Sequence, residues 1–363
     1  MCDPALIAGD VLSRRGLNRA TLARQLLLSR AVMPAYDAVE HLVGMQSQAP
    51  LAPYVGLWSR LASFRASELS RLTEGRELVR VHMMRNTVHL VSARDCLATH
   101  RLFQPVHAQA FAGQFGRRVT GVDRAELLAT ARALLDERPR TRAELGKLLA
   151  ERWPGVDPSS LAYLVTHHMP LLQVPPRGLW GGNGPAAWAP VESWLGKPVD
   201  PAPVVDTLVL RYLAGFGPAS VADVQVWSGL TRLREVVERL PLRRFAAEDG
   251  RILYDLPDAP RPDPETPAPP RFLPEYDNLL LSYSDRSRVI EAGRKVPLPP
   301  GTGAAVGTLL VDGMWRGTWK ITGGVLHVET FAPLSDRDAV LEEGARLLRF
   351  ARPDTESPDV VLR

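Results

Sequence analysis

Two glutamines separated by one residue are the side chains most suited to take part in chemistry in this sequence. Gln46 and Gln48 flank Ser47, between an apolar run at 43–45 and a proline-containing segment that begins at Ala49. An amide is a negligible general base, but its oxygen accepts hydrogen bonds and its nitrogen donates them. Two amides can therefore hold and orient a water molecule, or they can satisfy backbone groups at a helix end. The residues alone leave both interpretations open.

A helix and a proline should fix the position of this triplet. Ala35, Val39 and Val43 share one face at helical spacing, which predicts a helix over 35–45. Pro50 disfavours helical backbone at the residue before it, so the helix should end close to the triplet. We therefore expect both amides at a helix exit, beside the core.

Composition favours a globular, cytoplasmic protein of two to four modules. The chain has 363 residues, of which 45% are hydrophobic and 23% charged. No apolar run approaches the ~20 residues of a membrane span, and the N-terminus lacks a signal-peptide pattern. Two cysteines, Cys2 and Cys96, give no disulfide framework and no metal-binding pair.

The titratable residues argue against several kinds of chemistry. Lysine is scarce, which leaves few candidates for a Schiff base, and none lies near Gln46 in the sequence. The histidine pairs 167–168 and 100/107 lack a third ligand at suitable spacing for zinc. We therefore expect neither a metal nor a cofactor.

Helices followed by a hairpin recur three times along the chain, which is the winged-helix plan. In the first segment we predict helices over 21–29, 36–45, 54–61 and 66–73, then strands over 78–82 and 87–91. In the second we predict helices over 124–137, 145–151 and 161–168, then strands over 171–174 and 186–189 around a glycine-rich tip. The third has helices over 203–213, 218–229 and 230–240, then a hairpin over 242–245 and 251–254.

After a proline-dense linker the chain becomes rich in β-branched residues. We predict strands over 278–283, 307–311, 317–321 and 325–331, then a helix over 336–350, as in a small β-barrel or sheet domain. The predicted fold class is α+β, with three tandem winged-helix modules and a C-terminal β-barrel-like domain. The predicted boundaries are 1–122, 123–199 and 200–256 for the modules, 257–270 for the linker and 271–363 for the last domain.

Several passages together resemble one family. They are Gly44–Pro50, Met84–Val91, Leu273–Leu281 and Gly307–Gly313 with Gly317–Trp319. In this order they are similar to the tandem winged-helix DNA glycosylases that unhook alkylated guanines. The resemblance spans nearly the whole chain. It implies a C-shaped channel for double-stranded DNA bearing alkylated guanine, a monomer, and no cofactor.

The resemblance gives the glutamines a catalytic role. The family signature is Gln-x-Gln in an antibiotic-resistance branch and Gln-x-Asp in a broader repair branch, and this chain carries Gln46 and Gln48. Guanine alkylated at N7 is positively charged and leaves as a neutral base. Positioning of water then suffices to hydrolyse the N-glycosidic bond. The implied enzyme is monofunctional and serves DNA repair and self-resistance to a genotoxic natural product.

A strand motif should supply the rest of the site. Thr87 and His89 alternate onto one face of the predicted strand, and the resemblance implies that they line the site with Arg85. A buried histidine bonded to backbone is the alternative for His89. The motif usually reads Arg-Gly-Thr-x-His, and Asn86 takes the glycine position. Asparagine tolerates left-handed backbone, so we expect the turn to be kept.

Basic and aromatic residues are candidates for DNA contact. The hairpin at 177–188 could enter a groove with Arg177, Trp180 and Asn183. Further candidate phosphate contacts are Arg117, Arg118, Arg243 and Arg244.

Two non-catalytic functions stay open at this point. Winged helices most often serve transcription regulators, and fold alone does not imply function. The second alternative is a protein that binds and sequesters the genotoxic natural product itself, through aromatic residues such as Trp180 and Trp188.

Overall fold

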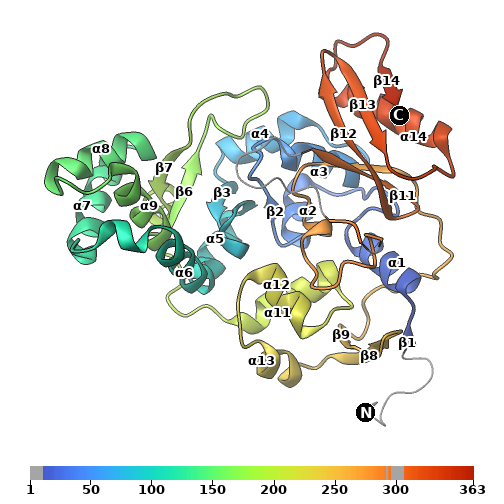
Figure 1. Ribbon diagram of the computed structural model, residues 1–363, viewed down its shortest axis with the longest axis horizontal. Coiled ribbons are helices and arrows are strands. Elements are labelled where there is room, and N and C mark those ends of the chain that lie inside the picture. Colours follow the sequence, from blue (N-terminus) through green and yellow to red (C-terminus); the bar gives the residue numbers. More distant parts are fainter. Residues whose placement is uncertain (1–10, 292, 296–305) are drawn as a thin grey trace.

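The computed structural model describes residues 11–291, 293–295 and 306–363. It is a mixed α and β structure, as predicted. Helices of residues 124–168 gather at one end of the long axis, and the strands and helix after residue 306 lie toward the other end (Figure 1). Cys2 lies outside the described residues, and Cys96 is a buried free thiol. In the described part, no helix has the length and apolar composition needed to cross a membrane.

The first segment consists of helices that lead into an antiparallel strand pair. Ser13 caps the first helix by accepting a hydrogen bond from the Gly16 amide at 3.0 Å, so this helix begins earlier than predicted. The elements are α1 (Arg14–Arg24), α2 (Ala35–His41), α3 (Ala52–Arg60), α4 (Ala66–Glu74), β3 (Leu78–His82) and β4 (Val88–Ser92). Both strands lie within one residue of their predicted positions.

The helix before the glutamine triplet ends earlier than predicted. α2 stops at His41, and Val43 and Gly44 then adopt left-handed backbone with φ of 54° and 89°. Glycine is needed at this turn because a Cβ on Gly44 would lie 2.6 Å from Val91 Cγ1. The chain then enters the short strand β2 (Met45–Gln46). The triplet therefore starts in an edge strand and not at a helix exit.

The second segment shares a sheet with the first. Its strands β6 (Leu171–Val174) and β7 (Ala187–Pro190) form the predicted antiparallel pair, and β6 also pairs with β3. The strand order is β2-β4-β3-β6-β7-β5, with β5 at Arg140–Thr141. The two predicted hairpins are thus parts of one six-stranded sheet.

The helices of the second segment pack at the far end of that sheet. α7 (Arg124–Glu137), α8 (Arg142–Arg152) and α9 (Pro158–His168) lie where the caps predicted them, and Thr141 forms a capping box with Glu144. Three further helices escaped prediction: α5 (Ala93–Thr99), α6 (Gln104–Phe115) and α10 (Val191–Leu195).

The third segment has the predicted order of helices and hairpin. Its helices are α11 (Val205–Phe216), α12 (Val221–Ser228) and α13 (Arg234–Arg239), and its strands are β8 (Arg243–Ala247) and β9 (Ile252–Asp255). The strand β1 (Val11–Leu12) adds to β8 in parallel, so the start of the described chain closes this small sheet.

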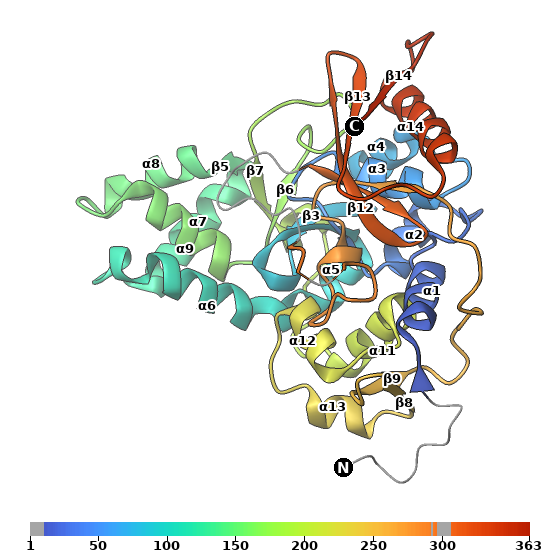
Figure 2. The same ribbon diagram turned by 45° about the vertical axis from the view of Figure 1, so that its right-hand side comes forward.

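The described C-terminal strands form an open sheet, which is the second of the two predicted forms and not the barrel. Their order is β10-β11-β12-β13-β14, so β10 and β14 are the two edges among the described residues. Helix α14 lies beside α3 and α4 in both views and packs on the sheet through β10 and β13 (Figure 2). A helix that covers one apolar face removes the need for the sheet to close on itself. The bounds are β10 (Arg271–Leu273), β11 (Gly307–Val311), β12 (Met314–Thr322), β13 (Val325–Thr330), α14 (Arg337–Ala351) and β14 (Asp359–Leu362).

The strand predicted at 278–283 is wrong. The segment forms a 3-10 helix, η5 (Asn278–Leu280), which Asp277 caps by accepting a hydrogen bond from the Leu279 amide at 3.0 Å. Leucines favour helical backbone over strand, and a capping aspartate starts a helix.

Buried ion pairs tie distant parts of the chain together. Arg24 of α1 forms a bidentate pair with Asp255 of β9, with N–O distances of 2.6 and 2.7 Å. Arg60 of α3 pairs in the same way with Asp277, at 2.9 Å for both bonds. All four side chains are buried, so each charge is compensated away from water.

Candidate active site

Strand pairing brings Gln46 to the predicted strand motif. β2 runs antiparallel to β4, which sets Gln46 opposite His89, and the Ser47 amide donates to the Val88 carbonyl at 2.7 Å. Gln46 is 7% exposed, whereas Gln48 is exposed. The triplet therefore leads from the interior to the surface along one edge of the six-stranded sheet.

The turn between β3 and β4 is strained at two consecutive residues. Arg85 and Asn86 have φ of 55° and 57°, so asparagine keeps the left-handed turn expected at the glycine position. Two histidines hold the Asn86 amide: His107 Nδ1 lies 2.9 Å from its oxygen and His167 Nε2 lies 3.2 Å from its nitrogen. Both bonds form with neutral imidazoles, in which His107 donates and His167 accepts.

Arg85 fixes the orientation of the buried glutamine. Its Nη2 donates to Gln46 Oε1 at 2.8 Å and to Asn278 Oδ1 at 3.0 Å, while its Nη1 donates to the Trp227 carbonyl at 2.6 Å. An arginine can only donate, so the Gln46 oxygen must face it. The Gln46 NH2 group is left without a partner among the described residues and available to a ligand.

Gln48 is oriented in the same sense by the backbone. The Val88 amide donates to Gln48 Oε1 at 3.3 Å, which turns the Gln48 NH2 group outward. The side-chain oxygen of each glutamine thus accepts a hydrogen bond from the protein, and each side-chain NH2 group is left facing outward. The sequence led us to expect the side-chain oxygens to hold a water, and in this geometry the nitrogens are the free groups.

A second arginine holds the middle of the triplet. Arg80 is 2% exposed, and it donates from Nε to Ser47 Oγ at 3.0 Å and from Nη2 to the Ser47 carbonyl at 2.9 Å. No carboxylate in the described part of the chain pairs with Arg80 or with Arg85. Burial lowers the pKa of each to about 10, with Arg177 and Arg286 as the respective second causes, so both stay charged near neutral pH.

The two strand-motif residues occupy different environments. Thr87 is half-buried and donates its hydroxyl to the Met84 carbonyl at 3.1 Å. His89 is fully buried, and its Nδ1 lies 3.0 Å from the Thr87 carbonyl. Burial and then the Arg85 charge lower the pKa of His89 to about 3, so it is neutral. This geometry matches the alternative of a buried histidine bonded to backbone.

A cavity of about 10 Å³ lies beside Gln46. This is close to the minimum that admits one ordered water, provided that polar partners surround it. The residues around it that can offer such partners are Gln25, Gln46, Arg60, Asp277 and Asn278. The buried end of the triplet therefore rests on a polar network.

The predicted groove-entering hairpin is anchored to the protein. Trp180 packs against Tyr54 and Phe350, with ring centroids 5.0 and 5.3 Å away, so its ring is not at a free tip. Arg177 donates to the Gly184 carbonyl at 3.0 Å and closes the loop on itself. Asn183 is exposed at the tip, and its contact with DNA stays a prediction.

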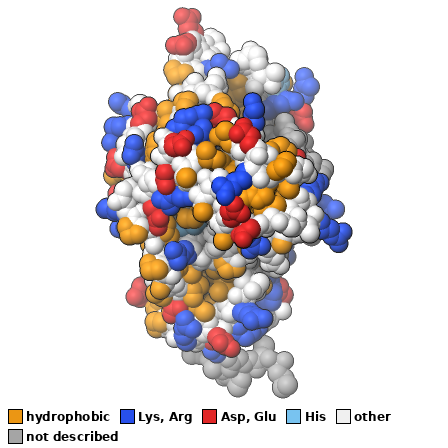
Figure 3. All heavy atoms as spheres, turned by 90° about the vertical axis from the view of Figure 1, so that its left-hand side faces the viewer, with side chains coloured by type: hydrophobic (Ala, Val, Ile, Leu, Met, Phe, Trp, Pro, Cys, Tyr) orange, Lys and Arg blue, Asp and Glu red, His pale blue; other side chains and the backbone are white. Residues whose placement is uncertain are grey.

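The four arginines predicted to contact phosphates are all exposed. They lie in two places, at the end of α6 for Arg117 and Arg118 and on β8 for Arg243 and Arg244. The end of the molecule that carries α7 and α8 shows basic and acidic side chains interspersed, and not one basic patch (Figure 3). Charge alone therefore does not mark the face shown there as a DNA surface.

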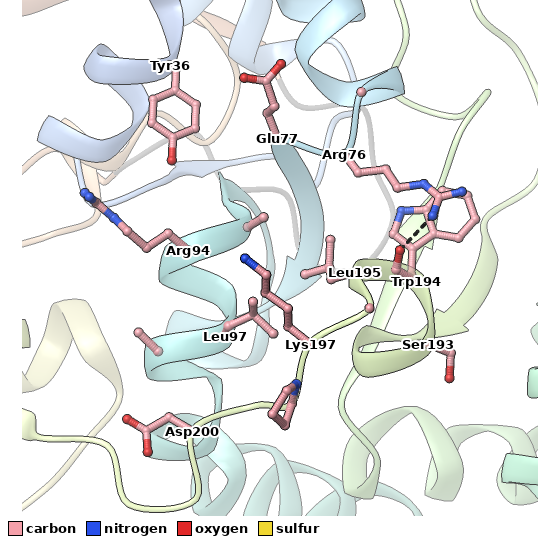
Figure 4. Close-up of a pocket in the computed structure, with 15 residues that line it drawn as sticks. Tyr36, Arg76, Glu77, Arg94, Leu97, Ser193, Trp194, Leu195, Lys197 and Asp200 are labelled. Carbon is pink, nitrogen blue, oxygen red and sulfur yellow. Dashed lines mark hydrogen bonds between the residues drawn. The ribbon is translucent and has the colours of Figure 1, made fainter.

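A large cleft lies away from the triplet. Its volume is about 910 Å³, and it opens where β3 begins and β4 ends, opposite the turn that carries Arg85. Figure 4 shows Lys197 reaching into it and Arg76 stacked on Trp194, with 4.1 Å from guanidinium to ring centroid. Size alone does not identify the site here, because the cleft contains no part of the triplet.

Two residues of the site were not found from sequence. Asn278 receives Arg85 and donates to the Gly44 carbonyl at 3.3 Å, which ties the motif at 273–281 to the triplet. The sequence does not distinguish Arg80 from the other arginines. The signal for Asn278 was its place in a motif of the resemblance, whereas nothing local marked Arg80. In the described residues, no group of three or more His, Cys, Asp or Glu could hold a metal ion.

The comparisons with known proteins agree with this fold. A family model described as "DNA glycosylase AlkZ-like" matches residues 39–350. The chain therefore belongs to the AlkZ-like DNA glycosylase family, whose members act on DNA as glycosylases.

One solved structure shows the same fold over the full length. The DNA glycosylase AlkZ of Streptomyces sahachiroi is similar with a TM-score of 0.74 and 21% identity, covering 97% of this chain and 99% of that one. The search of curated proteins found no match.

Proposed function

We propose that this protein hydrolyses the N-glycosidic bond of N7-alkylated guanine in double-stranded DNA, in bulky monoadducts or interstrand crosslinks. It would thereby serve DNA repair and self-resistance to a genotoxic natural product. The observation that carries the proposal is the Gln46-Ser47-Gln48 triplet. Arg85 holds the Gln46 oxygen, Arg80 holds Ser47, and the Val88 amide holds the Gln48 oxygen, so both glutamines present N–H groups.

The chemistry follows from a leaving group that is already activated. One NH2 group donates to the attacking water, whose remaining lone pair adds to C1′, and the other donates to an acceptor atom of the departing base. The C1′–N9 electron pair leaves with the base, so cationic N7-alkylguanine departs neutral, and one O–H bond of the water breaks to release its proton, which ends in solvent. Gln46 and Gln48 are the proposed catalytic residues, with Arg85, Thr87 and His89 around them.

The proposed scaffold is three tandem winged-helix modules around a C-shaped channel. Duplex DNA would contact Arg117, Arg118, Arg177, Trp180, Asn183, Arg243 and Arg244. The recurring order of helices and hairpin in the three segments supports this assignment. The enzyme is proposed to be monofunctional, monomeric and cytoplasmic.

The test is single-turnover base release from duplexes carrying N7-methylguanine, a bulkier N7 monoadduct or an N7–N7 crosslink. Gln46→Ala and Gln48→Ala should each lower release by about tenfold or more, because each removes one donor, while DNA affinity stays nearly unchanged. Gln114→Ala, at an exposed glutamine of α6, is the matched control.

Each negative outcome has a separate meaning. No release from any adduct, with tight sequence-specific duplex binding, would favour a regulator. Tight binding of the genotoxin without DNA would favour a sequestering protein. Full release by both glutamine variants would remove the triplet from the mechanism.

A further inference from the structure

The proposed site offers donors to the water but no group that takes its proton. Both glutamine oxygens already accept hydrogen bonds, from Arg85 and from the Val88 amide. His89 is buried and neutral with a strongly lowered pKa of about 3, so it is a very weak base. A water held by these groups would keep its proton until it met a carboxylate.

One carboxyl group, in a turn whose neighbouring residues line the cavity beside Gln46, has no ion pair among the described residues. Glu275 lies in the turn between β10 and η5, and its side chain is half-buried. Its carboxyl group meets its own backbone N–H, and no other partner for it exists in the described part of the chain. The buried carboxylates within the described ranges are all paired with arginines, as Asp255 and Asp277 are. Removing a carboxylate from water without a compensating cation costs folding free energy. A residue that is kept in such a position often has a functional role.

The turn that carries Glu275 is anchored on both sides. Before it, the Leu273 carbonyl accepts a hydrogen bond from Trp319 Nε1 at 2.9 Å. After it, Asp277 pairs with Arg60 and Asn278 receives Arg85. A turn held this firmly presents its side chain in one place.

Strain in the same turn adds a second observation. Tyr276 has a φ of 60°, a left-handed backbone that is unfavourable for a bulky residue. Such strain persists only where the surroundings impose it, and it gathers at functional positions. The anchors on Asp277 and Asn278 impose it here.

The turn also reaches the cavity of the triplet. Pro274, Asp277 and Asn278 line the cavity beside Gln46, and Glu275 directly follows Pro274 in the chain. Asn278 and Gln46 share the same Arg85 Nη2 group. Glu275 is thus within a few residues, on both sides, of groups that touch the glutamine network.

The electrostatic setting suits a proton acceptor. Burial raises the pKa of Glu275, and no charged neighbour contributes to that shift. The other described carboxyl groups with a shifted pKa all move downward. The charged groups that contact this turn are Arg60, which pairs with Asp277, and Arg85, which donates to Asn278. A raised carboxyl pKa brings the base closer to working pH.

We propose that Glu275 is a catalytic residue that takes the proton of the attacking water. The inference rests on the proposed glycosylase function. The water oxygen forms its bond to C1′, one O–H bond breaks and its proton passes to the Glu275 carboxylate. The C1′–N9 bond breaks with its electron pair leaving on the base. Glu275 then returns the proton to solvent, so no other reactant is required.

The experiment is single-turnover release of N7-methylguanine from duplex DNA across pH 5 to 9. Glu275→Gln keeps the shape of the side chain but cannot accept a full proton, so release should fall about 100-fold and lose its rise with pH. DNA affinity should stay unchanged. Glu68→Gln is the matched control, because Glu68 is half-buried but only accepts a hydrogen bond from the Ala35 amide.

A second variant separates catalysis from structure. Glu275→Ala should regain at least about tenfold in rate on addition of formate, a small carboxylate that can enter the space left by the side chain. A structural role would give no rescue.

Failure of this inference is distinguishable from failure of the proposed function. Wild-type protein that releases no base would sink the function itself. Wild-type release together with an unchanged rate and pH profile in Glu275→Gln would overturn the role of Glu275 alone. A slow Glu275→Ala variant that formate does not rescue would likewise overturn it.

Discussion

Two pairs of interior arginines behave in opposite ways. Arg24 and Arg60 each meet an aspartate in a bidentate pair and join segments far apart in the chain. Arg80 is equally buried and Arg85 is half-buried, yet they donate only to carbonyl, hydroxyl and amide oxygens. The first group is neutral as a unit, whereas the second keeps its positive charge. Stability alone explains the first group but not the second.

The surplus charge is found where the glutamine triplet is held. An uncompensated buried cation costs free energy, so its persistence marks a position where something else is gained. Around the second group the histidines are neutral, and His82, His100, His107 and His167 form a chain of ring contacts 5.7 to 6.0 Å apart. The region therefore holds neutral imidazoles beside two cations, Arg80 and Arg85, that pair with no carboxylate in the described part of the chain.

Acid should affect the unpaired region most, which gives the largest predicted effect. Burial lowers the pKa of His89 and His107 to about 3 and that of His100 and His167 to about 4, from an unfolded value near 6.5. Between these values the unfolded chain binds more protons, so stability is present above pH 6.5 and is lost as pH falls toward 4.

The free energy of unfolding should therefore drop by roughly 5 kcal/mol between pH 7.5 and 5.5, since each histidine contributes about 1.4 kcal/mol per pH unit. Urea unfolding at the two pH values measures it. A stability that is flat over this range would mean that the four imidazoles are not buried as described.

Breaking a pair in the neutral group should damage the fold and leave the chemistry intact. Asp255→Asn leaves the Arg24 charge buried without compensation, so the free energy of unfolding should fall by about 3–5 kcal/mol. Base release per folded molecule should not change. The control is Glu238→Gln in the exposed pair with Arg234, where the loss should stay below about 1 kcal/mol. Equal losses in the two variants would contradict the contrast drawn above.

Removing a charge from the unpaired group should do the reverse. Arg85→Met leaves Gln46 unanchored, so single-turnover base release should fall about 100-fold, equivalent to about 2.7 kcal/mol. The free energy of unfolding should hold or rise, because a buried cation without a carboxylate has been removed. A variant that unfolds more easily but releases base at the normal rate would assign Arg85 to structure.

Much of the fold was predictable because its signals are local. The strands at 78–82, 171–174 and 307–311 and the helix at 124–137 match the structure residue by residue. Alternating β-branched residues and capping side chains act over a few positions, so one segment suffices to read them. The pairing of β3 with β6 joins residues about ninety positions apart and leaves no local mark.

The site was predictable in part for the same reason. Gln46, Arg85, Thr87 and His89 do come together, because the strand motif and the triplet pair as β4 and β2. The free ends of the amides could not be foreseen, since they depend on which donor reaches each oxygen. Arg80 is distinguished by being buried without a carboxylate partner among the described residues, which is a property of the folded chain.

The sheet shared by the first two segments has a consequence for how the chain can be divided. β3 is hydrogen-bonded to β4 on one side and to β6 on the other. A fragment that ends at residue 122 would leave the backbone N–H and C=O groups of β3 that face β6 unpaired, and such an exposed strand edge can pair with another chain. The first two segments should therefore be transferred between proteins only together, in evolution or by engineering, even though their sequences look like separate repeats.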